Sequence, residues 1–174
     1  MSSICYNLLG DIMNLTKKLE KYLKENIEIE KTSLYRREKF GSALSEAALE
    51  ETSINNYIND NKEDTFQKKL FELIDNRALK DSDVYNKVNI DRRLFSKIRS
   101  NEEYHPSKET VILLGIGLEL EEYEMEELLE SASYSLPKNT TYDLIIRFCF
   151  KEHIYDINTI NGFLYDHNCK TLNL

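Results

Sequence analysis

Apolar residues recur along most of this 174-residue chain at spacings of three and four, which is the period of an amphipathic helix. The chain has only five glycines and two prolines, so it offers few positions for the tight turns of β-hairpins. The pattern therefore predicts an all-α protein, and the length is sufficient to bury a hydrophobic core.

The first block of this pattern, residues 1–62, predicts an N-terminal helical block. Helices are expected over about 4–23 and 42–58, followed by a polar linker at 59–63. The apolar positions of these helices are Ile4, Leu8, Leu9, Ile12, Met13, Leu15, Leu19, Tyr22, Leu23, Ala43, Leu44, Ala47, Ala48, Leu49, Ile54 and Tyr57. So many periodic apolar residues favour ordinary core or a dimer interface over a ligand site.

The second block, residues 63–136, predicts a compact centre of five short helices. Asp64 and Gln67 have the spacing of a capping box, in which each side chain bonds the backbone near the other. The five helices are expected at about 66–76, 79–88, 92–100, 107–118 and 121–133. The third block, residues 137–174, predicts a C-terminal extension packed on the centre, with helices near 142–150 and 156–165.

The third helix of the centre carries the densest group of basic residues in the chain. Asp91 is expected to cap it, and Leu94, Phe95 and Ile98 fall on one side. The residues left for the other side are Arg92, Arg93, Ser96, Lys97 and Arg99. A turn followed by a capped helix with a cationic outer face is how a helix-turn-helix protein enters the major groove. The pattern indicates nucleic acid as the partner, and a solvated helix face is the alternative.

The formal net charge of −8 is unevenly distributed along the chain. The stretch 111–136 contains seven acidic residues and no Lys or Arg, whereas 77–99 contains seven basic and three acidic residues, a local charge of +4. A basic edge beside an acidic flank still allows DNA binding. The acidic helix 119–130 is interpreted as a solvated face, or alternatively as a patch for a protein partner.

No motif in the chain predicts an enzyme or a cofactor. There is no Gly-rich phosphate loop, no metalloprotease motif and no nucleophile beside a plausible base. Cys5, Cys149 and Cys169 are odd in number and far apart, which is typical of free thiols in a reducing cytoplasm. His167 and Cys169 could supply half of a metal site, but the other histidines lack ligand spacing.

Membrane insertion and export are not expected either. The longest apolar run, 111–118, has eight residues, far fewer than a membrane span needs. The N-terminal apolar residues are interrupted by Asn7, Asp11 and Asn14, unlike the apolar core of a signal peptide. The sequence therefore predicts a cytoplasmic protein.

Residues of the centre also carry a family resemblance. The apolar, capping and loop positions that match a known family pattern are Leu79, Val84, Ile90, Asp91, Phe95, Ile98, Pro106, Ser107, Thr110, Val111, Leu118, Glu119 and Leu120. On these positions, Asp64 to Tyr134 resembles the phage-repressor-like (lambda/Cro) helix-turn-helix family, and the run from Asn89 to Leu120 resembles a set of uncharacterised bacterial proteins.

The chain departs from the family pattern in three respects. Tyr85 stands where the family usually has Ala, Asn89 replaces the turn glycine, and Asp81 and Asp83 lie at the start of the helix that normally meets the phosphate backbone. Asn is tolerable in that turn because it adopts left-handed conformations more readily than most residues.

The resemblance implies a bacterial or phage-type transcriptional regulator that binds double-stranded DNA, as a homodimer. Arg92 and Arg93 are expected at base edges, with Ser96, Lys97 and Arg99 beside them, and Lys108 is expected at the phosphate backbone. The alternative function is a protein-interaction adaptor on the same fold, without DNA binding, in a bacterial stress or defence system.

Overall fold

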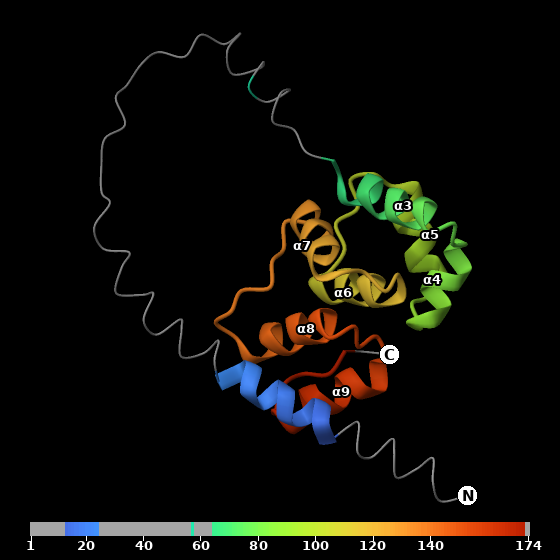
Figure 1. The fold of residues 1–174 in the computed structure, drawn as a ribbon. Helices are drawn as coiled ribbons and strands as arrows, with labels where there is room; N and C mark the ends of the chain where they lie inside the picture. Colours follow the sequence, from blue (N-terminus) through green and yellow to red (C-terminus); the bar gives the residue numbers. More distant parts are fainter. Residues whose placement is uncertain (1–12, 25–56, 58–63, 173–174) are drawn as a thin grey trace, which may run out of the picture.

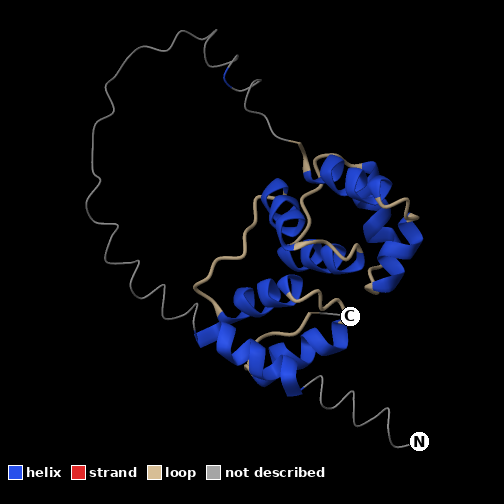
Figure 2. Cartoon of the chain, viewed as in Figure 1, coloured by secondary structure: helices blue, strands red, loops and turns tan. Residues whose placement is uncertain are grey.

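The structure, a computed structural model, describes residues 13–24, 57 and 64–172, which form helices joined by turns and contain no strand (Figures 1 and 2). The helices are the segment 13–24, α3 (Phe66–Asn76), α4 (Asp81–Lys87), α5 (Arg92–Ser100), α6 (Lys108–Gly117), α7 (Glu122–Ser131), α8 (Thr141–Lys151) and α9 (Ile157–Asp166). The prediction of an all-α fold is confirmed over these residues.

Helix α6 is the buried centre of the molecule. Every residue from Val111 to Leu118 is buried, and α6 packs against α4 on one side and α7 on another (Figure 1). Two glycines make these approaches possible. A Cβ atom at Gly117 would lie 3.0 Å from the carbonyl oxygen of Val84, and one at Gly115 would overlap Met125 Sδ. Larger residues there would push α4 and α7 away from α6.

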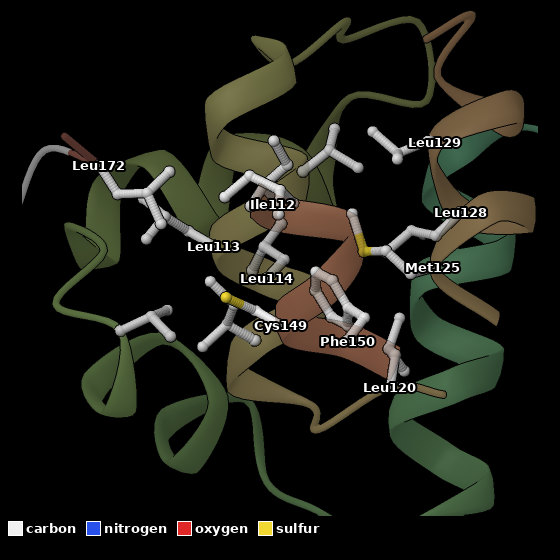
Figure 3. Close-up of a cluster of buried hydrophobic side chains, with 14 of the residues drawn as sticks. Ile112, Leu113, Leu114, Leu120, Met125, Leu128, Leu129, Cys149, Phe150 and Leu172 are labelled. Atoms are coloured by element: carbon white, nitrogen blue, oxygen red, sulfur yellow. The ribbon is translucent and has the colours of Figure 1, made fainter. Parts of the chain in front are cut away.

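The C-terminal helices extend this core. Phe150 of α8 lies near Gly115, and Figure 3 shows its ring beside Met125 in the same buried cluster. The hydroxyl of Tyr155, which follows α8, donates to the carbonyl oxygen of Leu120 at 2.8 Å. Apolar packing and a hydrogen bond therefore both join the extension to the five-helix centre.

The segment 13–24 packs on the C-terminal extension (Figure 1). Leu19 and Leu23 are buried, and the Tyr22 ring lies 5.5 Å from that of Phe148, centroid to centroid. Two predictions for the N-terminal block are wrong, since Met13 is 60 % exposed and Tyr57 is 69 % exposed. Helix periodicity places both residues on an apolar face. It does not show which positions of that face a neighbouring helix covers. The rest of the predicted 42–58 helix lies outside the described residues.

Six of the seven labelled helices end in the same way, and α5 is the exception. Each of the six is followed by a non-glycine residue with φ between 52° and 58°, and the next amide bonds back to a carbonyl five residues earlier. This is the Schellman motif, which usually contains glycine. The left-handed residues are Ala78, Asn89, Glu119, Ser133, His153 and Asn168. After α5, by contrast, Asn101 is extended with φ −130°.

Two local predictions in the centre are corrected by the structure. Thr65, not Asp64, caps α3, and its hydroxyl accepts from the Lys68 amide at 3.4 Å. Asp64 instead pairs with the Lys68 ammonium, and Gln67 points away from the cap toward α5. Leu79 precedes α4 and is 37 % exposed, because it belongs to the cap that ends α3.

Candidate nucleic-acid interface

A four-residue turn joins α4 to α5. Asn89 lies in this turn with φ 55°, the left-handed conformation expected of it as a substitute for glycine. The carboxylate of Asp91 accepts from the backbone amide of Arg93 at 2.6 Å, so the predicted N-cap of α5 is confirmed. The turn and the cap together fix where the first residues of α5 leave the protein surface.

The inner face of α5 is anchored in the core, as its spacing predicted. Phe95 and Ile98 are 2 % and 1 % exposed, and Leu94 is half-buried. The Phe95 ring contacts Tyr85 and Phe71, with centroid separations of 5.4 and 6.0 Å. Tyr85, which stands where the resembling family has a small residue, is therefore accommodated by an aromatic contact between α4 and α5.

The outer face of α5 is cationic and exposed. Arg92, Arg93, Ser96 and Lys97 all lie on it, and among the described residues none of the three cations has an ion-pair partner. The Lys97 ammonium lies 4.5 Å from the centroid of the Tyr104 ring, a contact that leaves its charge accessible. Four of the six predicted site residues therefore share one solvent-facing surface.

The other two predicted site residues are engaged within the protein. Arg99 makes a bidentate pair with Asp81, with N–O distances of 2.7 and 2.6 Å. Lys108 bonds the buried carboxylate of Asp143 at 2.6 Å and so joins α6 to α8. These two ion pairs connect residues far apart in the sequence. Neither the helix periodicity that predicted Arg99 as a site residue nor the family resemblance that implied Lys108 could therefore show them.

A shallow hollow of about 610 Å³ lies between the start of α4 and the outer face of α5. Lys80 and Arg92 both line it, together with Asp75 and Asp81. Lys80 is exposed, without an ion-pair partner in the described part of the chain. Sequence reasoning missed Lys80 as a site residue, although it belongs to the same basic stretch. It extends the cationic surface from α5 onto the N-terminus of α4.

The acidic residues of the stretch 119–130 contrast with this surface, since six of the seven face a basic group. Glu122 and Glu126 both pair with Arg147 of α8, whose side chain is 14 % exposed. The remaining ion pairs are Glu119 with Lys87, Glu124 with Arg77 and Glu127 with Lys69. The Glu121 carboxylate lies 3.7 Å from Nδ1 of the His153 ring. Most of the acidic run is therefore used to join α7 to its neighbours.

The described residues contain a buried thiol and no cluster of potential metal ligands. Burial raises the pKa of the Cys149 thiol to about 12, so this cysteine is protonated at neutral pH. No group of three His, Cys, Asp or Glu side chains that could hold a metal ion occurs within 13–24 and 64–172. Over the same residues, no helix has the length and apolarity needed to cross a bilayer.

No family model matches the chain, and neither the curated proteins nor the solved structures include a significant match.

Proposed function

We propose that this protein is a sequence-specific DNA-binding regulator that reads the major groove with α5. The observation that carries the proposal is the outer face of α5, where Arg92, Arg93 and Lys97 are exposed and without acidic partners in the described chain. Arginine can bond a guanine edge bidentately, and a lysine beside it can neutralise a phosphate.

The arrangement around α5 supports the same function. The helix is anchored by buried Phe95 and Ile98, so its cationic residues project from a rigid element. Asp91 caps the N-terminal end, and Arg92 and Arg93 are the first two residues after it. In helix-turn-helix proteins, the N-terminal residues of the second helix are the ones that contact base edges.

A homodimer is part of this proposal, because two copies can read two half-sites one helical turn apart. The proposed contact set is Arg92, Arg93, Ser96, Lys97 and Lys80. Arg99 and Lys108 are left out, since their charges are already paired with Asp81 and Asp143.

The second candidate is a protein-interaction adaptor on the same fold. Asp83, exposed near the start of α4, and the net charge of −8 favour it, because both oppose approach to phosphates. The acidic residues of α7 add little to this candidate, since most of them are paired internally.

Fluorescence anisotropy distinguishes the DNA-binding regulator from the protein-interaction adaptor. Full-length protein is used to select duplexes from a random pool at about 50 mM salt, where even non-specific contacts are strong. Replacing Arg92 or Arg93 by Ala should weaken binding to the selected duplex by about 1–3 kcal/mol and relax sequence preference. Lys97→Ala should weaken binding to all duplexes alike and reduce the salt slope by about one unit.

Lys138→Ala is the matched control, because Lys138 is exposed in the connection between α7 and α8 and has no ion-pair partner in the described residues. It should change neither affinity nor salt slope. Absence of wild-type binding at about 50 mM salt would reject DNA binding and favour the adaptor.

A further inference from the structure

The C-terminal end of α5 is held by another helix. The last carbonyl groups of a helix have no partner within it and must be satisfied from elsewhere. Gln67 of α3 supplies this partner, since its side-chain amide donates to the carbonyl oxygens of Ile98 and Arg99 at 3.0 and 2.6 Å. The residues lie 31 and 32 positions apart, so the contact is a tertiary one.

A second tie acts at the same end. The Arg99 guanidinium pairs with Asp81 of α4 and also lies 4.0 Å from the centroid of the Phe71 ring of α3. Helices α3 and α4 therefore both hold the end of α5 that is farther from Arg92 and Arg93. If this end shifted, the nine-residue helix would turn about its buried Phe95 and Ile98, and its N-terminal residues would be displaced in turn.

We propose that Gln67 is a positioning residue for DNA reading, an inference that rests on the proposed function. Its amide sets the direction of α5, so that Arg92 and Arg93 meet base edges in one register. Contacts with base edges require a precise geometry, whereas the attraction between a cation and a phosphate tolerates small displacements. Loss of the Gln67 amide should therefore reduce discrimination between sequences more than it reduces general affinity.

The test compares Gln67→Met with Glu72→Met in the full-length chain. Met keeps the approximate length of Gln but cannot donate a hydrogen bond, and Glu72 is an exposed residue of the same helix. Anisotropy is measured with a duplex selected by wild type and with a scrambled duplex of equal composition. Amide exchange of Asn101, which donates to Lys97 at the end of α5, is measured on the same samples.

In Gln67→Met, the ratio of affinities for the two duplexes should fall about 5- to 10-fold, the effect of one or two net hydrogen bonds. Affinity for the scrambled duplex and the salt slope should stay at wild-type values, and Asn101 should exchange faster. Glu72→Met should leave all four measurements unchanged.

Two results with Gln67→Met would overturn the inference. One is a ratio within twofold of wild type, and the other is an equal loss of affinity for both duplexes together with a lower melting temperature. The second result would give Gln67 a stabilising role only. If wild type prefers no duplex over another, the proposed function fails first and the positioning role fails with it.

Discussion

Helices α5 and α7 are similar in length and each buries an apolar inner face, but their charged outer faces are used differently. Carboxylates of α7 pair with basic groups from α3, α8 and the residues around them. The Arg92 and Arg93 side chains of α5 have no such partner among the described residues. The comparison shows that a run of like charges in sequence does not by itself make a charged surface, because tertiary partners decide which charges remain available.

The inner faces of the two helices should respond alike to truncation, and this is the largest effect we expect. Phe95→Ala in α5 should lower the free energy of unfolding by about 3–5 kcal/mol, and Met125→Ala in α7 by about 2–5 kcal/mol. Both side chains are almost completely buried, at 2 % and 1 % exposure. Urea denaturation measures both, and a loss below about 1 kcal/mol for either would contradict the packing described for that helix.

The next effect separates a paired cation from an unpaired one. Lys108→Met should cost about 3 kcal/mol of unfolding free energy, because it leaves the Asp143 carboxylate buried without its basic partner. Lys80→Met, which changes an exposed residue without an ion-pair partner in the described chain, should stay within about 0.5 kcal/mol of wild type. Thermal unfolding in parallel gives the comparison. Unchanged stability with weaker DNA binding in Lys108→Met would return Lys108 to the phosphate-contacting set.

Asp81→Asn converts a paired cation into an available one. It removes the carboxylate that holds Arg99, while the Gln67 amide still holds the carbonyl groups at the end of α5. Arg99 can then reach phosphate, and the salt slope should become steeper by about one unit. Because the pair is partly exposed, the cost to stability should be at most about 1 kcal/mol. Anisotropy at several salt concentrations measures the slope. A shallower slope would indicate that Arg99 holds α5 in place and cannot be spared for DNA.

The smallest effects concern the helix ends and should have opposite signs. Ser133, after α7, has φ 58°, so Ser133→Gly should stabilise the protein by up to about 1 kcal/mol through relief of backbone strain. Asn101, after α5, is extended, so Asn101→Gly should destabilise it by about 0.5 kcal/mol through the added flexibility of the unfolded chain. Chemical denaturation of the two variants should show this difference, and equal shifts would contradict it.

Features determined by neighbouring residues were predictable from the sequence. The N-cap Asp91, the left-handed Asn89 and the buried Phe95 all depend on residues within one or two helical turns. They were predicted correctly, because helix capping and helix periodicity are local properties. The cap of α3 was not, since Asp64 and Thr65 are adjacent candidates and the structure uses Thr65. The all-helical fold followed from the same regularities.

Features determined by distant partners were not predictable. The pairing of Lys108 with Asp143 and the turning of Gln67 toward α5 each require the packed structure. The same holds for the segment 13–24, whose periodicity shows which residues face inward but not which helix they meet. The sequence thus predicted a set of exposed cations on one helix. It did not show which of these cations remain without an ion-pair partner in the folded protein.

The docking of segment 13–24 on α8 also bears on how the chain folds. Lys18 and Glu152, which form an ion pair at 2.9 Å, are separated by 134 residues, whereas α3 to α9 follow one another through short connections. Contacts between near neighbours in sequence form fastest, and a long chain closure slows the step that requires it. We expect α3 to α9 to assemble first and segment 13–24 to dock last. The same segment should detach first during unfolding, which exposes Phe148 while the proposed DNA-reading helix is still in place.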